Sequence, residues 1–361
     1  NITERASAAP SFQKIFKHWK ESQEKSARWG GMWGSSKSLF TACLAREISE
    51  PLLVICTNSY QARCFFDDLV TWGRNPILFP ARESALGPEA TVLKDRQSAL
   101  ELLKRKNAKN IFITTTPALI QAVPDSDDSD YNLNLEEGMH LDPDSLTKKL
   151  IDAGYERVPA ISDSGEFSIR GDIFDIFPPA VGEPLRLEFF DDELESIRVF
   201  DITSQRTRHT LKNIQVPLIL KLSETAKPNE KLLLDILPEN FHIISVEPNL
   251  IKKQNHSLSF LGKDAVQNLI KIEQKIKGFQ RVDFMAMPGE HGDIDTLSVE
   301  EFCIGVSEGI KLLAQKSIEG EKVYIKCSTD AEADRLRQVC LDQKLSDHQI
   351  IIEKGDLTQG F

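Results

Sequence analysis

The sequence has no long hydrophobic run, few tyrosines and no paired-cysteine motif, and each absence excludes a class of protein. It contains no stretch of about 18 apolar residues, the length that a membrane-spanning helix needs, and no secretory or lipidation signal, so we expect no membrane contact. The 6 cysteines lack Cys-x-x-Cys spacing and the 7 histidines have no neighbouring ligand at metal-site spacing, so we expect no metal. Cys56 and Cys327 stand in apolar strand-like runs, as reduced core cysteines do. A cytoplasmic protein is therefore expected.

The charge balance is acidic, with a formal net charge of -11 at pH 7. Affinity for duplex DNA depends on cations that neutralise phosphates, so this balance opposes strong non-specific DNA binding. Two local basic patches run against it, at Lys252-Lys253 and at Lys271–Lys277. The second follows an amphipathic helical pattern, which favours a solvated helix face over a binding site.

Length and pattern predict an α/β and α+β multidomain chain. At 361 residues it exceeds the usual size of one domain, and since it does not begin with methionine we expect a fragment of a longer protein. From 12 to 120, short apolar runs alternate with amphipathic ones, which predicts a parallel α/β lobe. The acidic run Asp125–Asp130 is interpreted as a boundary or exposed loop. A strand-rich domain is predicted over 121–212 and a small mixed α/β domain over 213–297.

The alternation of strand and helix resumes over 298–361, where Ser298 and Glu301 form a capping-box pattern. We expect this tail to return to the first lobe and complete its sheet, so that 12–120 and 298–361 form one domain. The predicted strands are Leu52–Cys56, Ile77–Phe79, Asn110–Thr115, Phe241–Val246, Lys322–Cys327 and Gln349–Glu353, and the predicted helices include Arg96–Lys106, Lys263–Lys277 and Ala331–Gln343.

Two segments of the strand-rich region show an alternation that leaves polar and aromatic side chains on an outward face. In the segment from 185 to 190, Leu185, Leu187 and Phe189 are expected to face a core, because successive side chains of a strand point to opposite sides. The opposite side then carries Arg186, Glu188 and Phe190. In the segment from 166 to 170, Arg170 falls on the outward side, before a bulge or sharp bend at Gly171.

Arginines and an aromatic on neighbouring strands are typical of an interface hot spot, whereas the alternative is ordinary sheet surface. Because Arg186 and Phe190 are expected to be exposed, we predict that their replacement leaves folding nearly unchanged, unlike that of Phe189.

The run G-M-W-G-S-S-K-S approximates the phosphate loop G-x-x-x-x-G-K-[ST], with Ser36 in place of the second glycine. A Cβ at this position obstructs the close approach of backbone N–H groups to phosphates. We therefore interpret the loop as degenerate, serving as a strand-to-helix turn. Gly31, Lys37 and Ser38 match the motif, and Gly34 is a further glycine within the loop. These four residues are the candidate positions of the degenerate nucleotide-binding loop.

A long ordered run in the strand-rich region resembles a known family. The run GEFSIRGDIFDIFPP from Gly165, then RLEFFDDELESIRVFD from Arg186 and SQRT from Ser204, is similar to the signature shared by the bacterial excision-repair protein UvrB and the amino-terminal UvrB-like module of the transcription-repair coupling factor, Mfd. The similarity extends to 153–158 upstream and to 357–361 downstream. It implies a RecA-like parallel lobe whose first domain is split around two others.

The resemblance also bears on catalysis, because ATP hydrolysis needs a carboxylate that holds Mg²⁺. Where the active members of the family carry aspartate, this chain has Val246, and only Glu247 remains. UvrB also carries a tyrosine-rich β-hairpin that grips DNA, and the 4 tyrosines here are unclustered. The chain therefore resembles the coupling factor's module more than UvrB. We expect no catalytic residue and no cofactor in this chain.

Two functions follow from the resemblance. The first is a non-catalytic recruitment module whose strand-rich domain binds UvrA by mimicking UvrB, in transcription-coupled nucleotide excision repair. Its motif positions imply Arg170, Arg186 and Phe190 as the partner contact, with Glu188 and Arg198 as weaker candidates. ATP, magnesium, RNA polymerase and DNA are implied for parts of the parent protein that are absent from this chain. The alternative is a UvrB-type, nucleotide-dependent DNA-remodelling enzyme that tolerates Ser36 and uses Glu247.

Overall fold

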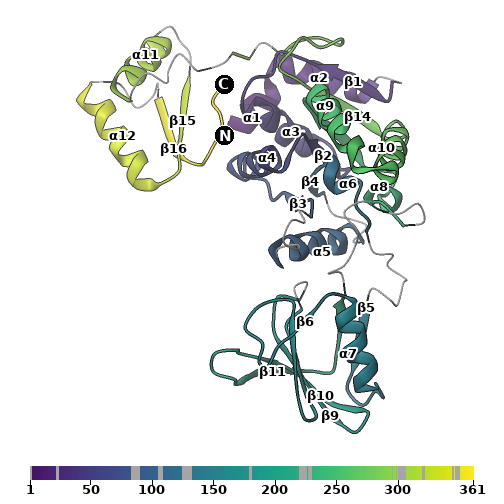
Figure 1. Cartoon of the computed structure of the whole chain (residues 1–361). Coiled ribbons are helices and arrows are strands. Elements are labelled where there is room, and N and C mark those ends of the chain that lie inside the picture. Colours follow the sequence, from purple (N-terminus) through teal and green to yellow (C-terminus); the bar gives the residue numbers. More distant parts are fainter. Residues whose placement is uncertain are drawn as a thin grey trace.

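The computed structural model describes most of the chain, in three bodies that can be told apart in Figure 1. One is built on a parallel sheet, one is rich in antiparallel strands, and one is a small unit near the carboxyl end. The described residues are 2–21, 24–82, 90–104, 109–123, 132–178, 181–218, 226, 230–294, 296–297, 299, 306–318, 322–343, 345 and 350–361.

The first body is organised by a 6-stranded sheet with the strand order β1-β14-β13-β2-β4-β3. All its described pairings are parallel. Every residue of β2 and β4 is buried, as expected for parallel strands that are covered on both faces. The strands are β1 (Ser26–Trp29), β2 (Leu52–Cys56), β3 (Ile77–Phe79), β4 (Ile111–Thr115), β13 (His242–Val246) and β14 (Gln280–Phe284).

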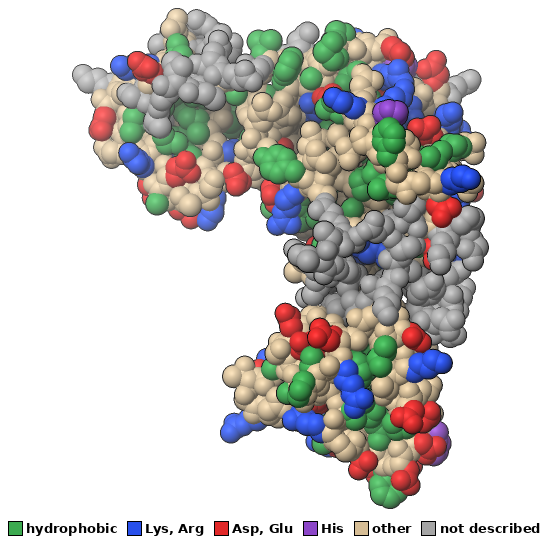
Figure 2. Space-filling view, viewed as in Figure 1, with side chains coloured by type: hydrophobic (Ala, Val, Ile, Leu, Met, Phe, Trp, Pro, Cys, Tyr) green, Lys and Arg blue, Asp and Glu red, His purple; other side chains and the backbone are tan. Residues whose placement is uncertain are grey.

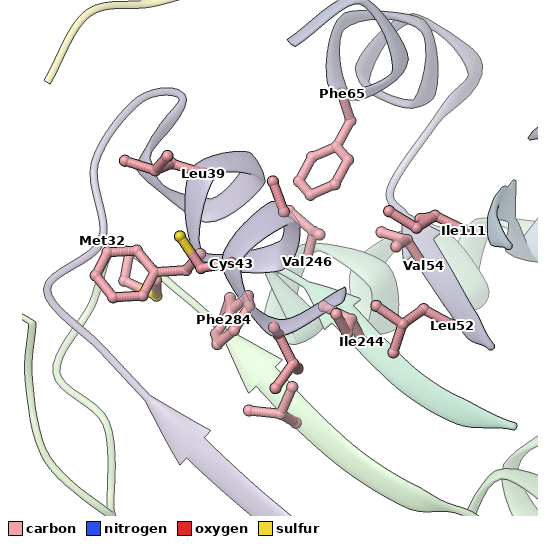
Figure 3. Close-up of a cluster of buried hydrophobic side chains, with 14 of the residues drawn as sticks. Met32, Leu39, Cys43, Leu52, Val54, Phe65, Ile111, Ile244, Val246 and Phe284 are labelled. Carbon is pink, nitrogen blue, oxygen red and sulfur yellow. The ribbon is translucent and has the colours of Figure 1, made fainter. Parts of the chain in front are cut away.

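Helices cover both faces of this sheet, because alternate side chains of each strand enter different cores. Val54 and Ile244 point into the first core, which is filled by the amino-terminal helices and is drawn in Figure 3. Leu53 and Ile243 point into the second core. The first face carries α1 (Ile2–Ala8), α2 (Pro10–Glu21), α3 (Ser36–Glu47) and α4 (Ser59–Thr71), and the second carries α5 (Ala90–Lys104), α6 (Thr116–Leu119), α8 (Leu233–Ile236), α9 (Pro248–Leu258), the 3₁₀ turn η1 (Ser259–Leu261) and α10 (Lys263–Ile276).

The expectation that the tail completes this sheet is wrong. The two tail strands, β15 (Val323–Cys327) and β16 (Ile350–Lys354), pair with each other in a separate 2-stranded sheet. They pack with α11 (Val306–Ile318) and α12 (Asp330–Asp342) around a small core of their own. The sheet is completed instead by β13 and β14, which the sequence pattern assigned to the separate domain at 213–297. The reason is burial: β13 is buried along nearly its whole length, whereas most of β15 is only half-buried.

The strand-rich body contains a second 6-stranded sheet with the order β11-β10-β9-β8-β7-β6. A 2-stranded pair of β5 and β12 and the helix α7 pack against one face of it, around the core that includes Leu146, Leu150 and Leu187. Asp142 caps α7 by accepting hydrogen bonds from the backbone N–H groups of Asp144 and Ser145. The elements are β5 (Asn132–Glu136), α7 (Pro143–Asp152), β6 (Glu156–Arg157), β7 (Glu166–Arg170), β8 (Ile173–Ile176), β9 (Leu185–Phe190), β10 (Glu193–Phe200), β11 (Thr207–Leu211) and β12 (Asn213–Pro217).

The predicted strands of the α/β lobe are confirmed to within one residue, and Cys56 and Cys327 are buried as expected. The helix predicted over Arg96–Lys106 begins six residues earlier, at Ala90. The acidic run Asp125–Asp130 and the capping-box residues Ser298 and Glu301 lie outside the described residues. Among the helices that the structure describes, none combines the length and apolarity needed to cross a membrane.

Candidate functional site

The hairpin of β7 and β8 aims the first predicted contact residue outward. Arg170 is the last residue of β7 and pairs with Ile173, so the chain reverses over Gly171 and Asp172. Gly171 has a φ of 60°, the left-handed conformation that a glycine adopts without steric cost. The sharp bend expected after Arg170 is therefore confirmed, and the arginine side chain is 50% exposed.

The alternation predicted for β9 is confirmed. Leu185, Leu187 and Phe189 are buried in the core, and the Phe189 ring meets Phe174 edge-on at 5.3 Å between centroids. Phe190 points the other way at the end of β9, opposite Glu193, and is 66% exposed. A large aromatic side chain is thus held in solvent by a strand whose opposite face is fully packed.

Strand register brings the predicted partner residues onto a single outward face. Across the sheet, Asp175 of β8 pairs with Arg186 of β9, which in turn pairs with Arg198 of β10. Glu188 lies two residues further along β9 and pairs with Ser196. In the space-filling view, basic and acidic side chains lie among hydrophobic ones on this body (Figure 2). We call this outward surface, defined by Arg170, Arg186, Glu188, Phe190 and Arg198, the contact face.

A buried carboxylate that sequence reasoning did not single out organises the contact face. Asp175 is 1% exposed and accepts hydrogen bonds from Arg170 Nη2 at 2.7 Å and from Arg186 Nε and Nη2 at 2.6 and 2.8 Å. Arg186 also donates to Oε1 of Gln205 at 2.7 Å and lies over the buried ring of Phe200, 4.2 Å from its centroid. These hydrogen bonds with Asp175 raise the pKa of Arg186. The signal in the sequence was a polar residue inside the apolar run I-F-D-I-F.

This network changes one expectation about Arg186. Its side chain is only 16% exposed, so it supports the sheet as well as contributing to the surface. Removing it leaves the carboxylate of Asp175 with a single arginine, and folding will not be left nearly unchanged. Glu188 and Arg198 form a second pair, and Glu188 also accepts a hydrogen bond from Ser196 Oγ at 3.0 Å. The most accessible groups of the contact face are therefore Phe190 and Arg170.

The degenerate phosphate loop connects β1 to α3, at the carboxyl end of the parallel sheet. Gly31 and Gly34 have φ values of 66° and 51°, which the curled loop requires. The two remaining motif residues are buried and already engaged. Lys37 Nζ lies 3.0 Å from Oε1 of Glu247, and Ser38 Oγ lies 3.0 Å from Asp68 and accepts from the indole N–H of Trp72 at 2.9 Å.

Three backbone N–H groups of the loop are bonded within the protein. Ser35 N–H donates to the carbonyl of Gln359 at 3.0 Å, Trp33 N–H to Oγ1 of Thr296 at 2.8 Å, and Ser36 N–H to the Trp33 carbonyl at 3.1 Å. The segment that contains Gln359 passes close to the loop. A Cβ on Gly34 would lie only 2.3 Å from the carbonyl oxygen of Gly360. A cavity of about 230 Å³ remains beside the loop.

Asp68 of α4 links this carboxyl-terminal segment to the loop. It is 4% exposed and accepts hydrogen bonds from the Ser38 hydroxyl at 3.0 Å and from the Thr358 N–H at 2.8 Å. Burial raises the pKa of this carboxyl, although its hydrogen bonds act in the opposite direction. Thr358 further donates to the carbonyl of Cys64 at 3.2 Å. The resemblance had included this segment, but sequence reasoning did not place it over the loop.

One set of metal-ligand side chains comes together from distant parts of the chain. Ligand atoms of His18, Glu24 and His291 all lie within 4.8 Å of one another. Both ring nitrogens of His291 already have a hydrogen-bond partner. Nδ1 accepts the backbone N–H of Arg28 at 3.0 Å, and Nε2 lies 3.1 Å from Glu24. The proton then belongs on Nε2, facing the carboxylate, and no lone pair of this imidazole is left for a cation.

Comparison with known proteins finds one domain family and several relatives that match parts of this chain. Residues 133–217 match the UvrB interaction domain family, and this range covers the sheet that carries the contact face. The chain is also 34% identical over 212 residues to the transcription-repair-coupling factor of Bacillus subtilis, covering 56% of this chain and 18% of that protein. Its counterpart in Myxococcus xanthus is 31% identical over 199 residues, with shares of 52% and 17%. A Staphylococcus aureus relative is 31% identical over 193 residues, with shares of 52% and 16%.

These findings confirm the resemblance to the UvrB-like module of transcription-repair coupling factors. The chain spans less than a fifth of the length of the curated relatives that it matches.

Proposed function

We propose that this chain is a non-catalytic recruitment module of a transcription-repair coupling factor, which binds UvrA through the contact face in transcription-coupled nucleotide excision repair. One observation carries the proposal: the match to the UvrB interaction domain covers the sheet on which Phe190, 66% exposed, stands beside paired arginines. A protein that copies the partner face of UvrB would bring the damage-recognition protein to a stalled RNA polymerase.

The division of labour on the contact face supports a binding role. Asp175 accepts hydrogen bonds from both Arg170 and Arg186, which restricts their side chains, so less side-chain entropy is lost when a partner packs on them. Phe190 supplies an exposed aromatic of the kind that anchors interfaces. At about 3.3 Å per residue, Arg186 and Phe190 lie roughly 13 Å apart along β9, which one standard interface spans.

The non-catalytic part of the proposal is supported by the loop. Phosphate binding needs a free lysine and free backbone N–H groups, whereas Lys37 is paired with Glu247 and the N–H of Ser35 is taken by Gln359. Val246 is buried where the family's active members carry aspartate. ATP, magnesium, RNA polymerase and DNA then belong to other parts of the parent protein.

The test is a titration of purified UvrA against the chain and three variants. Phe190→Ala and Arg170→Ala should each weaken binding about thirtyfold, the effect of a loss of about 2 kcal/mol. Phe260→Ala is the matched control, because Phe260 is a phenylalanine with 79% exposure on the α/β lobe, away from the strand-rich sheet. Unchanged affinity for Phe190→Ala, or an equal loss for Phe260→Ala, would sink the proposal.

A further inference from the structure

The loop that joins β10 to β11 has an unusual backbone conformation at Gln205. The φ of this residue is 56°, in the left-handed region that residues other than glycine seldom adopt. Hydrogen bonds of the backbone close the loop around it. The N–H of Gln205 donates to the carbonyl of Asp201 at 2.7 Å, and the N–H of Asp201 donates to the carbonyl of Arg206 at 2.9 Å. A glycine would adopt this conformation without steric cost, so a glutamine here calls for a role of its side chain.

The side-chain amide of Gln205 is bonded at both ends. Its Nε2 donates to the carbonyl of Ile202 at 2.7 Å, which fixes the amide against its own loop. Its Oε1 accepts from Nη2 of Arg186 at 2.7 Å, which connects the loop to the contact face. Because Gln205 is exposed, water competes with both hydrogen bonds, and they contribute little to the stability of the fold. Their main effect is therefore on the orientation of Arg186.

The bonding of the Arg186 guanidinium shows which of its donors remain for a partner. Asp175 accepts from Nε and from Nη2, and Gln205 also accepts from Nη2. The ring of Phe200 covers one face of the guanidinium, with its centroid 4.2 Å from the central carbon. A guanidinium has five N–H groups, so these bonds leave the two on Nη1, which bond to no other residue in the described part of the chain. The Nη1 donors are the ones that an oxygen atom of a partner can use.

We propose that Gln205 is a positioning residue of the contact face, which keeps the guanidinium of Arg186 turned so that Nη1 faces the partner. This inference rests on the proposed binding of UvrA. The carboxylate of Asp175 does not fix the orientation by itself, because its Oδ2 accepts from Arg170 as well as from Arg186. Gln205 supplies a third acceptor on the other side of Nη2, and it thereby determines which N–H groups stay bonded within the sheet. The cost of its left-handed backbone is offset by this preorganisation of a binding group.

The test is a titration of purified UvrA against variants of the loop, with a thermal melt of each variant. Gln205→Gly removes the amide and suits the left-handed backbone, so affinity should fall about tenfold while the melting temperature stays within about 3 °C of wild type. Gln205→Glu keeps an oxygen acceptor for Arg186 and should bind within about threefold of wild type. Thr203→Gly is the matched control, because it introduces a glycine at an exposed position of the same loop and should change affinity less than about twofold.

A double-mutant cycle shows whether the effect passes through the guanidinium. In an Arg186→Lys background, which has no Nη2 group, Gln205→Gly should cost less than about twofold in affinity. Equal losses in the two backgrounds, or equal losses for Gln205→Gly and Thr203→Gly, would overturn the positioning role.

Phe190→Ala, measured in the same titration, separates this inference from the function on which it rests. If Phe190→Ala weakens binding and Gln205→Gly binds like wild type, the role of Gln205 is wrong and the proposed function stands. If both variants bind like wild type, both proposals are wrong.

Discussion

Asp175 and Arg186 face each other across β8 and β9 and form a two-point ion pair, with Nε and Nη2 of the arginine 2.6 and 2.8 Å from Oδ1 and Oδ2 of the carboxylate. The carboxylate is almost completely buried, at 1% exposed. The pair therefore stabilises the strand-rich body and also forms part of its surface. Substitutions on the contact face should consequently differ in whether they affect stability or binding.

Arg186→Ala should lower the free energy of unfolding by about 2–3 kcal/mol, because it leaves a buried carboxylate with Arg170 as its remaining cation. Urea unfolding of the purified chain measures this. Adding Asp175→Asn to Arg186→Ala should recover part of the loss, since the uncompensated charge is gone. Arg206→Ala is the exposed control and should stay within about 0.5 kcal/mol of wild type. If Arg186→Ala unfolded at the same urea concentration as wild type, the ion pair would contribute no stability.

Phe189 and Phe190 are adjacent phenylalanines on opposite faces of β9, so the same substitution separates stability from binding. Phe189→Ala should cost about 3–5 kcal/mol of stability, because it empties a core position against Phe174. Phe190→Ala should change stability by less than about 0.5 kcal/mol. Thermal melts of the two variants decide this. A melt that falls as far for Phe190→Ala as for Phe189→Ala would mean that the contact face is misassigned.

Lys37→Ala tests the phosphate loop in two ways. We expect neither wild type nor variant to hydrolyse ATP, with or without DNA, and a turnover that depends on Lys37 would restore the enzyme alternative. The variant should nevertheless lose about 2 kcal/mol of stability, because Glu247 is then largely buried without its cation. Glu247 also accepts the backbone N–H of Ala286 at 2.9 Å, so Glu247→Gln should be milder than Lys37→Ala. Equal stability of wild type and Lys37→Ala would show that the ion pair of Lys37 and Glu247 does not stabilise the fold.

The raised pKa of Asp68 predicts that its contribution to the free energy of unfolding decreases as the pH rises. Burial raises its pKa in the folded chain above the unfolded value of about 3.9, so the folded state binds the proton more tightly. This contribution is fully present below about pH 3.9 and is lost as the pH rises through the folded pKa. The stability of wild type relative to Asp68→Asn should therefore fall as the pH rises from about 4 towards 7. Asp67→Asn is the control, and the same pH trend in that variant would contradict the assignment.

Local pattern was sufficient to predict much of the fold. The strand at Leu52–Cys56, the helix beginning at Lys263 and the alternation of Leu185, Leu187 and Phe189 were all confirmed, because each depends on periodic burial of neighbouring residues. The partition of the chain was not predictable in this way. β13 lies between β14 and β2 in the first sheet, whereas β15 pairs only with β16 among the described strands. Which of them joins that sheet depends on contacts between segments far apart in the chain, and no local pattern carries that information.

The sequence by itself determined which residues lie on the outward face of β9 and that the phosphate loop lacks a glycine at Ser36, since both follow from spacing along the chain. Only the tertiary structure decided that Asp175 accepts hydrogen bonds from two arginines and that the carbonyl of Gln359 accepts the N–H of Ser35 in the loop. The physical reason is that hydrogen bonds and ion pairs between distant segments depend on the packing of whole strands and helices. Alternation sets the direction of a side chain, and packing sets its partner.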